Sequence, residues 1–499
     1  MRWLSSFADR RIWKPTPVRP SSSPPLPTRR PRHVEYHHRH HLRDWGPHGR
    51  TGPHWHEQFD GNHRRRRGDD CLGARASRPG SSGRVADRNT MQYAPSDRRP
   101  AVWLTLSALV VTAIASPLYA EPRSVGVDLA NGTAAAIVVD DEALVHTTQL
   151  LPFDEEGGIA ADDLDGQMTQ VLANLTDALI AAGTQTDQLV RLNVYAARKD
   201  LVAPIRELLA RKLTRRVHPA VTTVVTPLAQ PEALLALDAV AAVPRQSPAL
   251  TSVIRTSPPG LSRRIGNAQT AVLPRGRVVY ISGMASRDKD LAAATTGTMQ
   301  QLHGVLRLLN LKPEHVVHLK AYMKPMSEVA RARKAMRAFY PNGPVPPMTF
   351  VEWSNGLPIE IEMIAFIPGK PDPAQAVQHR WQPDERRSPV YCRFAVVDSA
   401  TRIYVAGFLA RPKTDATGQV RDVFSQLKAT LAQTDSDFRH MVKATYYVAD
   451  DDVSKSLNDI RPELYDPQRP PAASKASIAG TGDDDRTITI DMIAVPKAK

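Results

Sequence analysis

Apolar residues recur at helical spacing in three separate parts of the chain. The stripe over Met168–Leu179 repeats at i, i+3, i+4, i+7 and i+11, which predicts an amphipathic helix that stops at Gly183. Matching stripes over Met299–Leu309 and Val420–Leu431 predict two more amphipathic helices further along the chain. Each helix has a single apolar stripe, so we expect each to pack against one face of a sheet.

A nine-residue block follows each of these helices. It reads Asp187–Tyr195, Glu314–Tyr322 and Arg439–Tyr447, so the closing tyrosines lie 127 and 125 residues apart. This period exceeds the roughly 20–50 residues of solenoid repeats and matches a whole domain of about 100–150 residues. The chain therefore contains three copies of one domain.

Proline clusters mark the boundaries between the copies. Pro244–Pro248 closes the first copy and Pro368–Pro373 the second, because proline suits neither helix interiors nor central strands. The predicted domains are copy 1 at 121–245, copy 2 at 248–370, a linker at 371–388 and copy 3 at 389–499.

Each copy repeats one order of predicted elements, strand–helix–strand–helix–strand. The first strands are expected at Leu144–Thr148, Val278–Gly283 and Ile403–Gly407. The second helices are expected around Pro204–Leu213, Ser327–Phe339 and Val453–Leu464, and the closing strands at Leu235–Ala241, Ile359–Ala365 and Ile488–Ala494. Helices that lie to one side of a sheet indicate an α+β fold.

The net charge of +14 is concentrated in the first 90 residues, where 19 Lys and Arg stand against 8 Asp and Glu. The net charge from Met91 onward is only +3, so the copies lack the positive electrostatic field that would attract nucleic acid. Residues 1–90 have no apolar period, which predicts a disordered basic leader. A nucleic-acid- or metal-binding tail, a genuine disordered extension and a start assigned too far upstream remain open.

Residues 91–120 have the pattern of a secretory signal peptide. Arg98 and Arg99 precede an apolar stretch from Ala101 to Ala115, and small residues end at Ala120. The apolar stretch of about 15 residues is shorter than the roughly 20 residues of a membrane-spanning helix, which favours a cleaved signal peptide. The alternative is an uncleaved membrane anchor. We expect a periplasmic or secreted protein that has no membrane association after cleavage.

Several segments of copy 2 resemble the RidA/YjgF family, also called L-PSP endoribonuclease-like. They are Tyr280–Gly283, Val317–Tyr322, Pro346–Met348 and Leu357–Ala365. Copy 3 carries a clear version of this pattern and copy 1 a divergent one. The resemblance implies three chorismate-mutase-like domains, each a mixed β-sheet with two helices on one face, packed as an intramolecular pseudo-trimer in a monomeric chain. It also implies small-molecule clefts between neighbouring copies.

The family's imine and enamine hydrolysis uses two residues in each cleft. An arginine in a Pro-Ala-Arg motif binds the substrate carboxylate, and a glutamate in the closing strand positions the attacking water. The matching positions hold Val221, Met348 and Ala473 for the arginine, and Ala236, Glu360 and Thr489 for the glutamate. Arg287 and Arg393 are candidate replacements for the missing arginine.

We therefore expect an exported Rid-like protein that binds a small metabolite between its copies, without cofactor or metal. Glu360 is the candidate catalytic residue. The candidate ligand-binding residues are Ser282, Gly283, Met348, Glu360, Tyr391 and Gly407. The alternatives are an imine or enamine deaminase-type hydrolase of altered specificity that uses Glu360, and a non-catalytic scaffold for partner proteins.

Other candidate chemistry is weaker. Glu314–His318 reverses the His-Glu-x-x-His order of metalloproteases, and His318 is matched by Arg191 and Lys443, which indicates an exposed strand position. Asp483–Asp485 lacks the spacing of a calcium loop and is interpreted as a polar turn.

Four more residues leave alternatives open. Cys392, the single cysteine after the signal segment, is either a packed thiol or a nucleophile. The second acids of the closing strands, Asp238, Glu362 and Asp491, are either solvated or paired at an interface.

Overall fold

The computed structural model describes residues 121–213, 218–244, 249–258, 266–372, 374–383 and 385–497. The predicted leader and signal peptide, residues 1–120, lie outside these described residues, as does most of the proline cluster that was predicted to close copy 1. No helix in the described part is long and apolar enough to cross a membrane.

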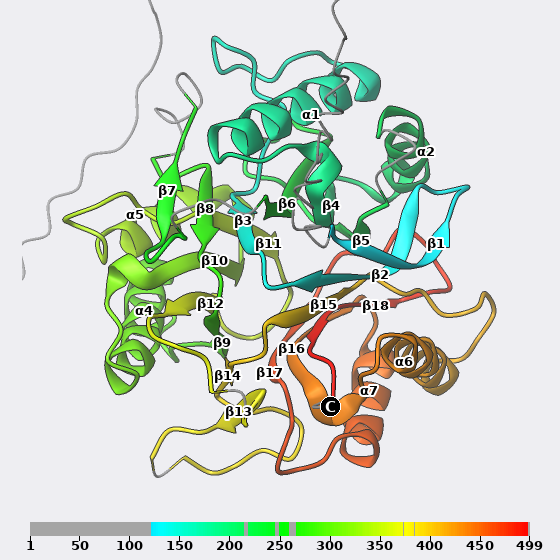
Figure 1. Ribbon diagram of the computed structural model, residues 1–499. Coiled ribbons are helices and arrows are strands. Elements are labelled where there is room, and N and C mark those ends of the chain that lie inside the picture. Colours follow the sequence, from blue (N-terminus) through cyan, green and yellow to red (C-terminus); the bar gives the residue numbers. More distant parts are fainter. Residues whose placement is uncertain are drawn as a thin grey trace, which may run out of the picture. The chain divides into compact units, whose positions relative to one another are not determined.

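Within the described residues, each copy supplies six strands and two α-helices, a pattern that repeats three times (Figure 1). Copy 1 has β1 (Arg123–Asp128), β2 (Thr133–Asp140), β3 (Ala143–Thr147), α1 (Leu164–Ala181), β4 (Leu189–Ala196), α2 (Val202–Lys212), β5 (Ala220–Val225) and β6 (Leu235–Val243). Copy 2 has β7 (Ile254–Thr256), β8 (Thr270–Leu273), β9 (Arg277–Met284), α4 (Leu291–Leu308), β10 (Val316–Met323), α5 (Val329–Arg337), β11 (Met348–Glu352) and β12 (Ile359–Ile367). Copy 3 has β13 (Val377–Arg380), β14 (Phe394–Val397), β15 (Thr401–Val405), α6 (Ala416–Gln433), β16 (Met441–Val448), α7 (Asp451–Leu464), β17 (Ala472–Ser477) and β18 (Ile488–Ala494).

The predicted α+β fold with mixed sheets is confirmed, but each copy has more strands than the predicted order contains. The strands form three sheets of six, with orders β5-β4-β6-β3-β8-β7, β11-β10-β12-β9-β14-β13 and β17-β16-β18-β15-β2-β1. The strands absent from the prediction are short or lack a clear apolar alternation, as in Ala472–Ser477. In each sheet one of them, β5, β11 or β17, runs parallel to its neighbour, and the other pairs are antiparallel.

The first two strands of each copy pair with the sheet of another copy. Only Asp398–Ala400 separates β14 from β15, yet β14 pairs with β9 of copy 2 while β15 pairs with β2 of copy 1. In the same way β8 of copy 2 pairs with β3 of copy 1. The exchange runs once around the three copies, so no sheet is complete without strands from a neighbour.

The first helix of every copy starts and ends in the same way. The N-cap residues Asp163, Asp290 and Asp415 each accept a hydrogen bond from a backbone N–H in the first turn. After the last turn the chain adopts positive φ, at Gly183 in copy 1 and at an Asn or Asp in the other two copies. These residue types tolerate the left-handed conformation that ends a helix.

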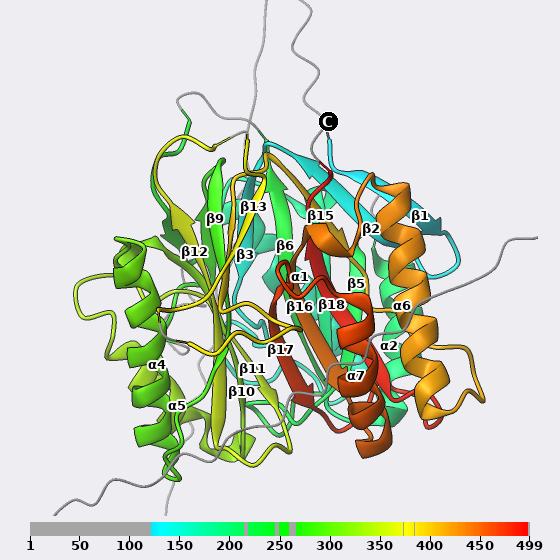
Figure 2. The ribbon, with the colours of Figure 1, turned by 90° about the horizontal axis from the view of Figure 1, so that it is seen from below.

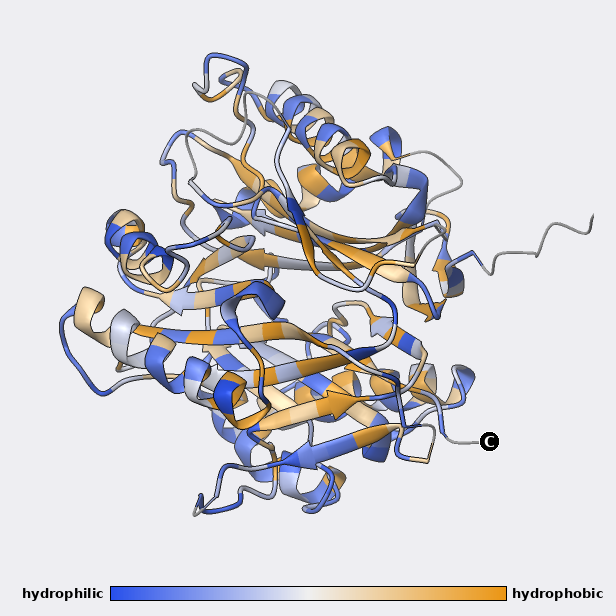
Figure 3. Cartoon of the chain, turned by 60° about the vertical axis from the view of Figure 1, so that its left-hand side comes forward, coloured by the Kyte–Doolittle hydropathy of each residue, from blue (hydrophilic) through white to orange (hydrophobic). Residues whose placement is uncertain are grey.

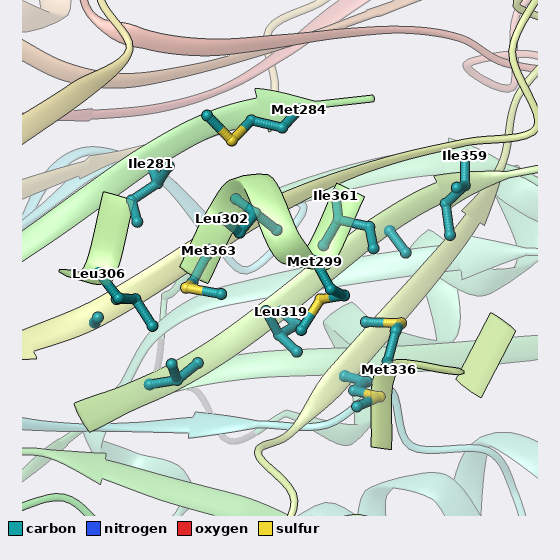
Figure 4. Close-up of a cluster of buried hydrophobic side chains, with 14 of the residues drawn as sticks. Ile281, Met284, Met299, Leu302, Leu306, Leu319, Met336, Ile359, Ile361 and Met363 are labelled. Atoms are coloured by element: carbon teal, nitrogen blue, oxygen red, sulfur yellow. The ribbon is translucent and has the colours of Figure 1, made fainter. Parts of the chain in front are cut away.

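The apolar stripes of these helices pack on one face of each sheet. In copy 2, Met299, Leu302 and Leu306 of α4 lie over Ile361 and Met363 of β12 (Figure 4). The helices lie on the outer side and the sheets on the inner side of the unit Ala108–Lys499 (Figure 2). Strands are mostly apolar, whereas helices alternate apolar and polar residues (Figure 3). Burial of each large side chain contributes roughly 1.5–3 kcal/mol.

The inner faces of the sheets form a further core that all three copies share. It contains Ile137 and Val240 of copy 1, Tyr280 of copy 2, and Tyr404 and Ile493 of copy 3. This shared core is the packing expected of a pseudo-trimer, and it brings a strand edge of each copy against its neighbour.

Candidate functional site

The backbones of three equivalent positions take part in hydrogen bonds across the three junctions between copies. In the parallel strand pairs, Val221 lies opposite Leu192, Met348 opposite Leu319, and Ala473 opposite Ala444. The shared register confirms that the residues matched by sequence occupy the same place in each sheet. Their surroundings differ, so the three clefts differ in what they can hold.

The cleft between copies 1 and 2 is filled by protein groups. Thr148, which stands where the other copies have glycine, donates a hydrogen bond through Oγ1 to the Met348 carbonyl at 2.7 Å. The Gln149 side chain adds a bond of 3.0 Å to the Phe350 carbonyl. Ala236, at the position equivalent to Glu360 of copy 2, is buried. Met348, a predicted ligand-binding residue, lies buried in the core of copy 2.

The cleft between copies 2 and 3 contains the predicted residues Ser282, Gly283 and Glu360. The Ser282 hydroxyl donates to the Cys392 carbonyl at 2.6 Å and accepts from the Ala473 N–H at 2.7 Å, so it joins the two copies. A Cβ at Gly283 would lie 2.0 Å from Glu360 Oε1. Only glycine therefore leaves space for the Glu360 carboxyl.

Glu360 is half-buried, and its environment favours the protonated carboxylic acid. Burial raises the pKa of the Glu360 carboxyl to about 8, and the nearby Glu362 carboxylate contributes to this rise. The Ser474 hydroxyl and the Arg393 guanidinium act in the opposite direction. A carboxyl with a pKa near neutrality can exchange a proton with a bound molecule.

The two arginines considered as replacements do not form a clamp beside Glu360. Arg393 is engaged by Glu385, with Nε donating to the carboxylate at 2.9 and 3.1 Å, and it lies 5.8 Å from the centre of the Tyr391 ring. Arg287 is exposed after the end of β9. Tyr391 lies beside Arg393. Cys392 is fully buried, and burial raises the pKa of its thiol to about 12. Cys392 is therefore a packed thiol.

The cleft between copies 3 and 1 holds a cavity of about 290 Å³. The Gly407 N–H donates to the Val221 carbonyl at 2.9 Å and fixes the contact between the copies. A Cβ at Gly407 would lie 3.0 Å from Thr222 Cα, so this close approach also requires glycine. The other walls come from the β1–β2 turn, α2 and the segment before β18.

Two arginines line this cavity and share one carboxylate. Arg486 Nη2 lies 2.6 Å from Asp483 Oδ1, and Arg206 Nη1 of α2 lies 4.0 Å from Asp483 Oδ2. The three side chains carry a net charge of +1. Arg486 Nε is buried and has no hydrogen-bond partner among the described residues. The arrangement can attract a small anion, because an oxyanion would complete the hydrogen bonding of the guanidinium groups.

The acidic turn next to these arginines ties copy 3 to copy 1. Asp484 forms an ion pair with Lys199 of copy 1. Within copy 3, Asp485 accepts a hydrogen bond from the Lys413 N–H at 2.9 Å. No sequence pattern selects Arg206 or Arg486, because neither belongs to a motif. Arg206 lies on an ordinary amphipathic helix, and only the tertiary structure brings it to the acidic turn.

The second acids of the closing strands form a cyclic set of contacts at the centre. Lys443 of copy 3 lies 3.0 Å from Glu362 of copy 2, and Arg191 of copy 1 lies 2.5 Å from Asp491 of copy 3. Thr349 of copy 2 donates to Asp238 of copy 1 at 2.9 Å. The acids are thus paired at interfaces.

The prediction that His318, Arg191 and Lys443 occupy an exposed strand position is wrong. All three are buried, with exposed fractions of 8%, 4% and 7%. The strands that carry them face the other copies and not solvent. Arg191 and Lys443 therefore pair with acids of neighbouring copies, whereas His318 forms a hydrogen bond with Thr349 of its own copy. In the described part of the chain, no group of three or more His, Cys, Asp or Glu residues is arranged to hold a metal ion.

Comparisons with known proteins agree with the threefold repeat. The model of the family described as Endoribonuclease L-PSP matches residues 134–243, 265–367 and 388–496. A comparison with curated proteins finds no match.

Solved structures of similar proteins each correspond to about a quarter of the chain. The Rid-family protein YyfB of Yersinia pestis is 26% identical, covers 25% of this chain and 96% of its own, and has a TM-score of 0.22. A YjgF-family protein of Neisseria meningitidis is 21% identical, with 24% and 95% covered and a TM-score of 0.18. A YjgF/YER057c/UK114-family protein of Mycobacterium tuberculosis is 21% identical, with 24% and 98% covered and a TM-score of 0.18.

Proposed function

The chain belongs to the Endoribonuclease L-PSP family and contains three tandem copies of the family's domain, and from this premise we propose that the protein binds a small anionic metabolite between copies 3 and 1. The observation that carries the proposal is the pair of guanidinium groups, Arg206 and Arg486, that share Asp483 in a cavity of about 290 Å³. A carboxylate or a phosphate fits their planar donors. The cavity volume suits a compact metabolite.

Two features of the chain support binding in preference to the family's chemistry. The positions of the family's arginine hold Val221, Met348 and Ala473, which cannot form charge-assisted hydrogen bonds. The cavity beside Arg206 has Thr489 where the family's glutamate would stand. A site with a relocated cation and no water-positioning acid suits recognition without hydrolysis.

Isothermal titration calorimetry with a panel of small carboxylates, phosphates and amines tests this proposal. Arg206→Gln and Arg486→Gln should each weaken binding of an anion by about tenfold or more, because a charge-assisted hydrogen bond contributes roughly 1.5–3 kcal/mol. Arg421→Gln is the matched control, since Arg421 is an exposed arginine that pairs with Glu463 on the surface. Equal affinity in all three variants, or no binding of any anion, would refute the proposal.

The second candidate function is hydrolysis of imines or enamines at the cleft between copies 2 and 3. It is favoured by the half-buried Glu360, whose pKa of about 8 suits proton transfer near neutral pH. An imine-hydrolysis assay of the wild type and Glu360→Gln tests it. Turnover that is absent, or equal in the two proteins, would leave Glu360 without a catalytic role.

We extend the proposal to export and to the monomeric state. The pattern of residues 91–120 supports removal of a signal peptide after Ala120. N-terminal sequencing of the protein recovered from the periplasm or medium should then begin at Glu121. Light scattering should report the mass of one chain, and a scaffold for partner proteins would require a stable complex instead.

A further inference from the structure

A cavity of about 560 Å³ lies between β7 and the loop that follows α5. Its walls come from Arg255 of β7, from the short 3-10 helix Pro313–His315, and from the loop Pro341–Pro344. It shares no wall residue with the cavity beside Gly407. Its volume falls within the roughly 300–1,000 Å³ of small-molecule sites.

The walls of this cavity are mainly aromatic and proline side chains. Phe339 and Tyr340 line it together with Pro313, Pro341 and Pro344. Tyr340 is held by the core of copy 2, with an exposed fraction of 5%, so its ring is a fixed surface. Flat apolar surfaces of this kind pack well against the ring of a ligand.

Arg255 is a rigid cation at one side of the cavity. Its guanidinium donates to the carbonyls of Pro344 at 2.6 Å, Pro313 at 2.7 Å and Val316 at 2.6 Å. Its Cζ lies 5.6 Å from the centre of the Tyr340 ring. Within the described ranges, no carboxylate forms an ion pair of 4.0 Å or less with this guanidinium. The carbonyls orient the group, and the Glu314 carboxylate of the same wall lies 3.9 Å from Lys312 Nζ and acts on Arg255 over a longer distance.

The equivalent place in copy 3 is built differently. His379 of copy 3 takes the position of Arg255. Each pairs with an alanine of the neighbouring strand, Ala395 or Ala271. Arg255 contacts the first carbonyl of β10, and His379 contacts the first carbonyl of β16. There Arg439 and Asp466, 3.2 Å apart, tie the 3-10 helix to the loop. The corresponding residues of copy 2 are Glu314 and Pro341, which cannot form this pair. At this place, copy 2 thus differs from copy 3 in the residues that join the 3-10 helix to the loop.

We propose that this cavity is a second binding site, for a flat aromatic molecule that carries a carboxylate or sulfonate group. The rings of Phe339 and Tyr340 and the neighbouring prolines contact the aromatic part. The charge of Arg255 attracts the anionic group. The site is independent of the cleft between copies 3 and 1, because it uses none of its residues.

Fluorescence titration of the full chain with anilinonaphthalene sulfonate, an aromatic anion, tests this site. Gly343 provides the blocking variant, because a Cβ there meets nothing within 4 Å and Gly343→Trp can place a large ring at the cavity mouth without strain. Gly356→Trp is the matched control, since Gly356 is a glycine with equally free space outside the cavity. We expect saturable binding in the wild type and in Gly356→Trp, and loss of binding in Gly343→Trp.

Two further measurements test whether the dye binds in this cavity and whether Arg255 attracts it. The uncharged probe phenylnaphthylamine should bind about tenfold more weakly than the sulfonate, which corresponds to about 1.4 kcal/mol. Arg206→Gln should leave sulfonate binding unchanged, whereas it weakens the anion cleft. Equal binding by Gly343→Trp and Gly356→Trp, with matching thermal midpoints, would overturn the site. Equal affinity for the charged and uncharged probes would overturn the role of Arg255.

Discussion

The replacement Glu360→Gln should change the pH dependence of stability in a defined direction. The pKa of the Glu360 carboxyl is about 8 in the folded protein and 4.5 for an ordinary glutamate. Between these values the folded state keeps a proton that the unfolded state has released, so the stability of the wild type falls as pH rises. Glutamine cannot ionise, and the variant therefore lacks this loss.

The size of the effect follows from the difference between the two pKa values. One unit corresponds to about 1.4 kcal/mol, so the shift from 4.5 to about 8 gives an upper bound of about 5 kcal/mol. The advantage of the variant over the wild type should be small near pH 5, larger near pH 7, and constant above about pH 9. Below pH 4.5 both states of the wild type are protonated, and the contribution of Glu360 is fully present.

Urea unfolding at pH 5, 7 and 9 measures this difference, with about the same slope expected in both proteins. Glu463→Gln is the matched control, since Glu463 is 54% exposed on α7 and its replacement should have the same small effect at every pH. A difference between wild type and Glu360→Gln that does not grow with pH would refute the raised pKa. It would also remove the reason to consider proton transfer by Glu360.

Three further predictions concern buried groups. Asp491→Asn leaves the Arg191 guanidinium without its carboxylate and should cost about 3–5 kcal/mol in urea unfolding; a loss below about 1 kcal/mol would contradict the buried pairing. Burial lowers the pKa of His318 to about 3, so the unfolded state takes up a proton near pH 6.5 that the folded state does not, and wild-type stability should fall as pH decreases across this window. His318→Gln should show a smaller fall between pH 7 and pH 4 in thermal unfolding, and an unchanged fall would be inconsistent with the buried histidine. Cys392, in a Cys71→Ser background, should react with iodoacetamide only after denaturation, because burial raises its pKa to about 12; rapid labelling of the native protein would exclude this packing.

Local patterns predicted the elements that are long and amphipathic. The stripe over Met168–Leu179 became α1, because its apolar residues can only be buried on one face. Strands such as β14, with four residues, and β17, with the sequence Ala-Ala-Ser-Lys-Ala-Ser, carry too little apolar pattern to be predicted. Their pairing is decided by neighbouring strands.

The candidate site was predicted only in part. Ser282, Gly283 and Glu360, which the resemblance to a known family placed among the candidate ligand-binding residues, lie together in the structure. Arg206 and Arg486 escaped prediction because a basic residue on a helix or in a turn has the same appearance in the sequence whether or not it lines a cavity. Copy-to-copy comparison also misled at His318, where a variable polar position was interpreted as exposed although it is buried between copies.

The sequence by itself determined the threefold repeat, the helices and the chemical identity of each cleft residue, because periodicity and residue type are local properties. The tertiary structure alone decided which copy receives each pair of first strands. Asp398–Ala400 could join two strands of one sheet, yet it leads from the sheet of copy 2 to that of copy 3. The tertiary structure also decided which clefts are filled and which remain open. Both outcomes depend on contacts between residues more than a hundred positions apart, such as Thr148 with Met348, and no local pattern records them.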